Sequence, residues 1–205
     1  MDYGFKDLKD PNAYNPERAK QLLAEDGWKD TDGDGILDKD GKPLTFNFVV
    51  YNSRAELPLY AEAVQADLKK VGIDMKIKTV DYNLIDKMGQ DGDYDMLISN
   101  IVTANTGDPI WFLANYWHTN NNGSNPQNGS GYSNPQVDQL LDAAETEFDP
   151  AKRRDYAIQI QQLLMNDGAA LFLGYPKTNI VTGSYLKGAV MYPSDYYWIT
   201  NKITK

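Results

Sequence analysis

Residues 44–80 read LTFNFVVYNSRAELPLYAEAVQADLKKVGIDMKIKTV, and this stretch decides the fold. An apolar run over 44–51 is typical of a strand. Apolar residues then recur at helical spacing from Pro58 until Gly72, where the helix is expected to end. Residues 73–80 alternate apolar and charged side chains, as a second strand does. A strand, a helix and a strand with such short joints predict a right-handed parallel βαβ unit.

Four Asn-Pro or Asp-Pro pairs each precede an apolar pattern of helical period. The side-chain oxygen of the first residue caps a helix, and proline is tolerated at the first helical position because its missing N–H would be unpaired there. The pairs are Asn15-Pro16, Asp108-Pro109, Asn134-Pro135 and Asp149-Pro150. They predict four further helix starts.

The rest of the sequence predicts further strands of the same sheet and a loop. The apolar run Tyr94–Val102 predicts a strand in the middle of the sheet. Residues 120–133 are rich in Asn, Gly and Ser and predict a mobile surface loop. Ala169–Tyr175 and Thr178–Thr182 predict returning strands. We therefore expect one α/β domain over residues 1–205, with a mixed sheet flanked by helices.

Composition excludes several classes of protein. The 205 residues include 29 acidic and 20 basic ones, a net charge of −9, which repels nucleic acid and anionic lipid. The chain has no cysteine, so disulfides and thiolate metal sites are excluded. Its apolar runs fall short of the ~20 residues that span a bilayer. A globular protein without a nucleic-acid partner is expected.

Residues 30–38 read DTDGDGILD, with carboxylates on alternate residues and Gly35 at the sixth position, as in a calcium loop. The twelfth position, where a bidentate Glu would stand, is Gly41, so a closed EF-hand is excluded. The candidate Ca²⁺ ligands are Asp30, Asp32, Asp34 and Asp38. An Asp/Gly turn without metal is the structural alternative.

Enzymatic motifs are missing. Ser130 stands in a Gly-Ser-Gly triplet and not in a nucleophile elbow. The single histidine, His118, cannot form a zinc site without carboxylates or a chelator to complete it. A hydrolase would have to depend on Ser130 and His118. We therefore expect a binding protein and not an enzyme.

The loop Val102–Asp108 follows the carboxyl end of a predicted strand and precedes a helix. In open α/β sheets ligands bind at that edge, and the N–H groups of a helix start favour carboxylates. Trp111 and Trp117 could form an apolar wall beside it. A capped helix alone would explain Asp108 and Pro109, but not the polar stretch before them.

Motifs throughout the chain resemble, in order, the carboxyl-terminal half of family 5 solute-binding proteins. These proteins serve ATP-driven importers of peptides, nickel and related metal chelates. The matching segments are Tyr14–Leu23, Gly27-Trp28, Asp32–Gly35, Val71–Ile73, Tyr94-Asp95, Gly107–Pro109 with Phe112-Leu113, Tyr132–Pro135 before Val137-Asp138, and Asp149–Ala151.

The resemblance implies a lobe of the type II periplasmic-binding-protein class, in which two lobes close on the ligand by a hinge. Family members are longer, with a leader and an amino-terminal lobe, so we expect this chain to be the excised carboxyl-terminal lobe. An extracytoplasmic location, in the periplasm or as a cell-surface lipoprotein, is expected for the whole protein. The expected partners are a small solute and a membrane permease, and we expect a monomer.

The solute is chosen from the same resemblance. Peptide-binding relatives hold the peptide amino group with an acidic residue where this chain has Asn105. Residues 103–109 are similar to nickel or metallophore binders, and His118 lies where a histidine can coordinate the metal complex. We favour nickel or a metal chelate, with an oligopeptide or a calcium-stabilised interaction module as alternatives. The expected ligand residues are Asn105, Thr106, Asp108, Trp111, Trp117 and His118. No cofactor is required in this prediction, apart from the calcium ion considered above.

Overall fold

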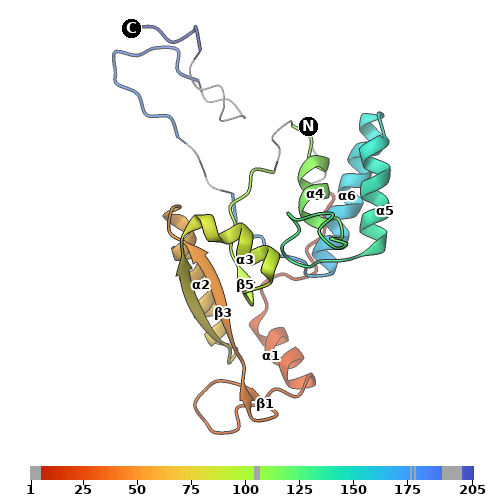
Figure 1. Ribbon diagram of the computed structural model, residues 1–205. Coiled ribbons are helices and arrows are strands. Elements are labelled where there is room, and N and C mark those ends of the chain that lie inside the picture. The colour runs from red at the N-terminus through yellow and green to blue at the C-terminus, as the bar shows by residue number, and fades with distance from the viewer. Residues whose placement is uncertain (1–5, 104–106, 176, 178, 191–199) are drawn as a thin grey trace. The chain divides into compact units, whose positions relative to one another are not determined.

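A computed structural model describes residues 6–103, 107–175, 177, 179–190 and 200–205. The chain forms two compact units, Met1–Leu171 and Phe172–Lys205. All helices and strands labelled in Figure 1 belong to the first unit. Within the described ranges, no helix is both long and apolar enough to cross a membrane. The expectation of a single lobe over the whole chain stays a prediction.

The predicted strand–helix–strand unit is confirmed as β3 (Thr45–Tyr51), α2 (Glu56–Lys69) and β4 (Asp74–Val80). The two strands pair in parallel over all seven residues of each. β5 (Met96–Leu97) pairs in parallel on the other side of β3, which gives the order β4-β3-β5. β3 is therefore the middle strand of this sheet.

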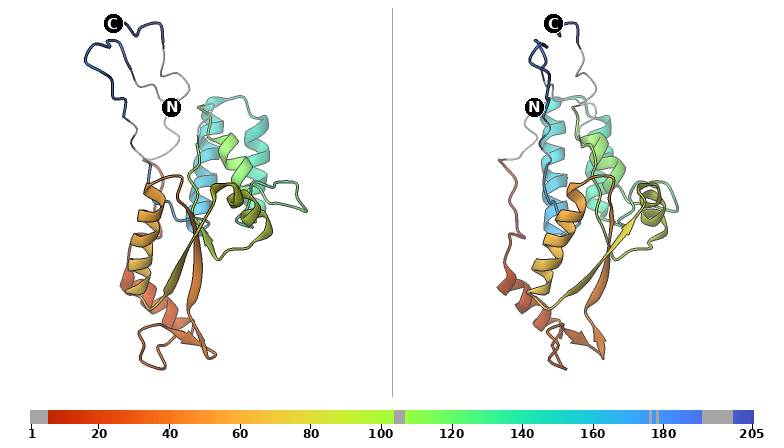
Figure 2. Two further views of the ribbon diagram at one scale, coloured as in Figure 1. Left: turned by 60° about the vertical axis from the view of Figure 1, so that its left-hand side comes forward. Right: turned by 90° about the vertical axis from the view of Figure 1, so that its left-hand side faces the viewer.

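Helices cover both faces of the sheet. The four residues Phe48–Tyr51 are at most 3% exposed, although their side chains alternate between the two faces. α2 packs on β3 and β4 and buries Leu57 and Ala61. α3 (Ile85–Asp91), which follows the short 3₁₀ helix η1 (Tyr82–Leu84), lies on the opposite side of the sheet (Figure 2). The βαβ unit thus has an apolar contact on each face.

The predicted helix starts are confirmed at α1 (Pro16–Glu25), α5 (Pro135–Thr146) and α6 (Pro150–Asn166). In each, the Asn or Asp before the proline accepts a hydrogen bond from a backbone N–H of the first turn. These caps satisfy amide groups that a helix start leaves unpaired. α4 (Ile110–Trp117) begins one residue later than its Asp-Pro pair would place it.

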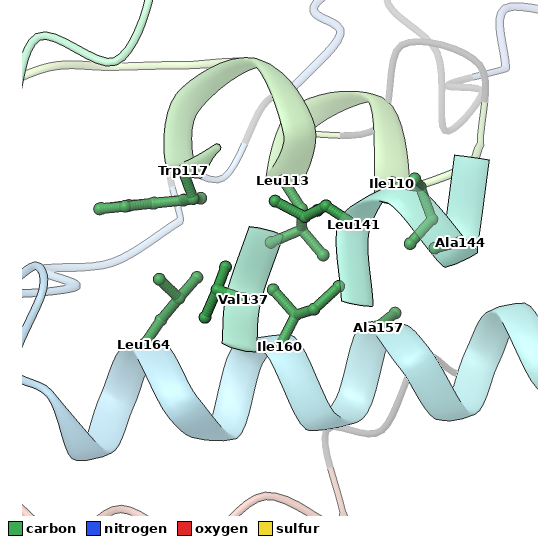
Figure 3. Close-up of a cluster of buried hydrophobic side chains, with 9 residues drawn as sticks. All are labelled: Ile110, Leu113, Trp117, Val137, Leu141, Ala144, Ala157, Ile160 and Leu164. Carbon is green, nitrogen blue, oxygen red and sulfur yellow. The ribbon is translucent and has the colours of Figure 1, made fainter. Parts of the chain in front are cut away.

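One buried cluster joins α4, α5 and α6 (Figure 3). Its members recur at helical spacing on one side of each helix, so the three helices share a single apolar contact. They are Ile110, Leu113, Trp117, Val137, Leu141, Ala144, Ala157, Ile160 and Leu164. We call these three helices the helical frame.

The strand predicted over Tyr94–Val102 is wrong in length and in place, because β5 has two residues and stands beside the middle strand. Side chains replace the missing ladder. The Asn47 N–H donates to the Asp95 carboxylate at 2.7 Å, in the place of a strand carbonyl. Beyond the last ladder bond, from Ile98 N–H to the Val49 carbonyl, the chain turns to side-chain partners.

The returning strands predicted at 169–175 and 178–182 are not formed within the described residues of those segments. Leu171, Phe172 and Val181 are exposed there. A strand needs a neighbour for its N–H and C=O groups, and the described residues of these segments have none. The apolar residues of these segments were therefore not enough to predict strands correctly.

A tight hairpin joins β1 (Asp38–Lys39) to β2 (Lys42–Pro43). The two turn residues between them, Asp40 and Gly41, have φ angles of 52° and 71°. Two left-handed residues in a two-residue loop define a type I′ turn, which favours glycine at its second position. The turn explains why Gly41 stands where an EF-hand would carry Glu.

Side-chain amides of asparagine hold the loop at 120–133 by hydrogen bonds to backbone carbonyls. Asn128 is 3% exposed and donates to the carbonyls of His118 at 2.9 Å and Tyr132 at 2.8 Å. A Cβ added at Gly129 would lie 3.1 Å from the Cα of Gly89 in α3. The loop is therefore not the loose surface segment predicted, and it contacts α3 backbone to backbone.

Candidate functional site

Three parallel strands end at the same edge of the sheet. β3 ends at Tyr51, β4 at Val80 and β5 at Leu97. Open α/β sheets bind ligands outside the carboxyl ends of their strands. This edge, which we call the carboxyl edge, is the candidate site.

Tyr51 is the fixed centre of the carboxyl edge. Its side chain is buried, and its hydroxyl accepts the Asn100 N–H at 3.1 Å. Its ring meets that of Tyr82 edge to face, with centroids 5.1 Å apart and 65° between the planes. Burial raises the pKa of the Tyr51 hydroxyl above its ordinary value. Tyr82 lies over it with 56% of its surface exposed.

The joint between β3 and α2 brings charge to the same edge. Glu56, in the first turn of α2, accepts a hydrogen bond from the Asn100 side chain at 3.4 Å. Arg54 is exposed and lies close enough for its charge to lower the pKa of Tyr51, against the effect of burial. Among the described residues, the Arg54 guanidinium has no hydrogen-bond or ion-pair partner. An unpaired guanidinium can take a carboxylate in two parallel hydrogen bonds.

Sequence reasoning missed Tyr51, Arg54, Glu56 and Asn100. The signal was available, since residues 52–55 follow a predicted parallel strand and precede a predicted helix. The same edge rule that selected the loop before Pro109 applies to this joint.

The first three predicted ligand residues belong to the loop after β5. Asn105 and Thr106 lie outside the described residues. Asp108 uses both carboxylate oxygens within the protein: Oδ1 accepts the Ile110 N–H at 2.9 Å and Oδ2 accepts from Arg153. Both carboxylate oxygens of Asp108 thus have partners at the start of α4, and its role as a solute ligand stays a prediction.

The other three predicted residues do not come together. Trp111, in the first turn of α4, is 40% exposed. Trp117 is 7% exposed and packs its ring against Tyr132, so it belongs to the core and forms no wall of an open cleft. An eight-residue helix is about 12 Å long, so His118 lies a helix length away from Asp108.

His118 is held between two carboxylates of α5. Its Nε2 lies 3.2 Å from Asp142 Oδ1, and its Nδ1 lies 3.6 Å from Asp138 Oδ1. Partial burial would lower the pKa of His118, but the Thr119 carbonyl and these two carboxylates outweigh it and raise the pKa. Both ring nitrogens thus face protein acceptors. The predicted role as a ligand of a metal complex has no support from this geometry.

The Asp-rich loop brings three of its four predicted ligands together. Carboxylate oxygens of Asp30, Asp32 and Asp38 lie within 4.8 Å of one another, while Asp34 is not in the group. Asp30 also accepts the N–H groups of Gly33 at 2.7 Å and Gly35 at 3.0 Å. The carboxylates thus hold the turn, and the three grouped oxygens are of the kind that binds Ca²⁺.

The chain matches the family model described as bacterial extracellular solute-binding proteins, family 5, over residues 1–124. It is similar to the oligopeptide-binding protein AppA of Bacillus subtilis, with 32% identity over 196 residues. That match covers 92% of this chain and 34% of AppA. The chain therefore spans about a third of the length of this relative.

Solved structures agree. The structure of Bacillus subtilis AppA in complex with a nonapeptide superposes with a TM-score of 0.69 and 31% identity, covering 80% of this chain and 32% of AppA. NikA from Brucella suis in complex with Fe(III)-EDTA superposes with a TM-score of 0.68 and 28% identity, covering 82% and 33%. The α/β fold is that of the periplasmic binding proteins. This chain belongs to the bacterial extracellular solute-binding proteins of family 5.

Proposed function

We propose that this chain is the solute-binding part of an ABC importer, and that its solute carries a carboxylate. The solute is a metal chelate such as a nickel complex, or a peptide. It is captured outside the membrane and passed to a permease. The family is one of extracellular solute-binding proteins, which supports the location; a lipid anchor and a monomeric state are further parts of the proposal.

The unpaired guanidinium of Arg54 at the carboxyl edge carries this proposal. Guanidinium groups bind carboxylates in a fixed, two-bond geometry. Linear peptides end in a carboxylate, and amino-acid or EDTA chelates carry several, so one cation suits both classes. The exposed ring of Tyr82 supplies apolar surface beside it. A nonapeptide bound to AppA and Fe(III)-EDTA bound to NikA are solutes of these two classes.

The two residues on which a hydrolase would depend, Ser130 and His118, each contact other side chains. Ser130 Oγ donates to Asn128 Oδ1 at 2.8 Å, while the His118 ring faces carboxylates of α5. A hydrolase needs its nucleophile within hydrogen-bond reach of its base. This arrangement supports binding without catalysis.

Calorimetry on the full-length protein that contains this chain tests the proposal. The titrants are a nonapeptide, Ni²⁺ with L-histidine, and Fe(III)-EDTA. One of them should bind, and Arg54→Gln should weaken it by roughly tenfold, the size of one charge-assisted hydrogen bond. Arg18→Gln is the matched control, because Arg18 is an exposed arginine on α1 that pairs with Glu25. Binding of none of the three, or equal affinity in both variants, contradicts the proposal.

A calcium-stabilised role is favoured by one observation, the grouping of Asp30, Asp32 and Asp38. Ca²⁺ bound there at a hundredfold excess over Kd should increase the free energy of unfolding by about 2.7 kcal/mol and so raise the melting temperature. Asp32→Asn should abolish the rise, because its amide keeps an acceptor for the Asp34 N–H but loses the charge. Asp91→Asn, an exposed carboxylate paired with Lys87, is the control. An unchanged melting temperature in the parent protein would contradict the calcium role.

A further inference from the structure

Arg153 ties three elements of the helical frame together. From α6, its Nη1 donates to the carbonyl of Ala144 and, at 3.0 Å, to that of Glu147 at the end of α5. Its Nη2 donates to Asp108, just before α4. The Arg153 side chain is 22% exposed, so these contacts are largely shielded from water. One guanidinium thus joins the end of α5 to the start of α4.

Asp108 passes this constraint on to α4. Its second oxygen accepts the Ile110 N–H, so the carboxylate joins the guanidinium and the helix start in one chain of contacts. Ile110 and Leu113 then anchor the first turn in the buried cluster. Trp111, between them, is the exposed aromatic of this turn. The direction of the Trp111 side chain follows from how the first turn is held.

The contacts of Arg153 require the planar, forked guanidinium of an arginine. Its planar guanidinium reaches acceptors on two sides at once, whereas a lysine ammonium is a compact point charge. The three oxygens belong to two carbonyls and a carboxylate on different segments. A lysine would keep the charge next to Asp108 but lacks the two separate Nη groups that contact these acceptors.

We propose that Arg153 is a positioning residue for the solute site: through Asp108 it sets the start of α4 and so the placement of Trp111, without touching the solute. This inference depends on the proposed function and adds to its solute site Trp111, the exposed aromatic in the first turn of α4, the helix that follows the carboxyl end of β5 in the chain. It predicts that Arg153 controls affinity even where the protein is fully folded.

The test compares four variants of the full-length protein. Arg153→Gln removes the charge and the fork, and Arg153→Lys removes only the fork. Asp108→Asn keeps an acceptor for the Ile110 N–H but loses the charge that faces Arg153. Arg154→Gln is the matched control, because Arg154 is the neighbouring arginine of α6 and pairs with Asp7 instead.

Affinity for the nonapeptide, Ni²⁺ with L-histidine and Fe(III)-EDTA is measured well below the melting temperature of every variant. Backbone hydrogen exchange at Ile110 and Leu113 is followed in parallel, with Ile160 in the centre of α6 as an internal reference. Both Arg153 variants and Asp108→Asn should weaken binding by roughly tenfold, as removal of an outer partner of a binding group does. Exchange at Ile110 should quicken while Ile160 stays protected, and Arg154→Gln should change neither.

Affinities of the Arg153 variants equal to that of Arg154→Gln would overturn the inference. If the unmodified protein binds none of the three probes, the proposed function has failed, and the exchange data decide the positioning role alone. In that case, unchanged exchange at Ile110 in Arg153→Gln and Arg153→Lys would overturn it as well.

Discussion

The helical frame and the carboxyl edge of the sheet differ in how far their side chains are buried. In the frame, Leu141 and Ile160 are completely buried. At the edge, Tyr82 is more than half exposed and Arg54 has no partner among the described residues. The frame buries its apolar side chains against one another, whereas the edge leaves an exposed ring and an unpaired guanidinium for another molecule. Substitutions of the buried apolar side chains of the frame should therefore lower stability, and substitutions at the edge should lower binding.

Leu141→Ala should have the largest effect on stability. It removes a fully buried side chain from the contact between α4, α5 and α6, and a cavity of this kind costs about 2–5 kcal/mol. Urea denaturation measures the loss. Leu59→Ala is the control, because Leu59 is 64% exposed on α2 and its truncation should change stability by about 0.5 kcal/mol at most. Similar losses for the two variants would mean that the frame is not the main core.

Tyr82→Ala should lower the free energy of unfolding by no more than about 1 kcal/mol, the contribution of its edge-to-face contact with Tyr51. Solute binding should suffer more, since the exposed ring is lost from the carboxyl edge. Urea denaturation and calorimetry on the same preparation separate the two effects. A large loss of stability with unchanged affinity would assign Tyr82 to the core.

His118 should give the smallest effect, a dependence of stability on pH of at most about 1 kcal/mol because its partners are partly exposed. Its pKa is raised in the folded protein, so protonation favours folding. This stabilisation is complete below the ordinary histidine value of 6.5 and is lost as pH rises through the folded pKa.

The measurement is clean because His118 is the only histidine in the sequence. Melting temperatures between about pH 5 and pH 8, where histidine titrates, should fall with rising pH more steeply in the parent than in His118→Gln. Parallel curves for the two proteins would show that the contacts with Asp138 and Asp142 add nothing to folding.

Local signals predicted the fold well. Asn134-Pro135 and Asp149-Pro150 begin helices because a cap and its helix are a few residues apart, so no distant partner decides them. Strands depend on neighbours. The βαβ unit supplies its own pairing, while the segment 169–175 has no pairing partner among the described residues and forms no strand.

The candidate site was predicted in principle but not residue by residue. The rule that ligands bind at the carboxyl edge selects the end of the sheet where the candidate site lies, but the loop before Pro109 drew the prediction and the joint with Arg54 did not. Trp117 and His118 were chosen for their chemistry, although the length of α4 separates them from Asp108. Asp108 and Arg153 are 45 residues apart in the sequence, so no local pattern predicts their contact.

The meeting of Gly89 and Gly129 determines how close α3 can come to the loop at 120–133. Because neither residue has a side chain, the separation is fixed by two main chains and not by the size of any packed group. Substitutions elsewhere in α3 or the loop can change chemistry without altering this spacing. A methyl group at Gly129 would lie 3.1 Å from the Cα of Gly89, so α3 and the loop would have to move apart slightly to accept it.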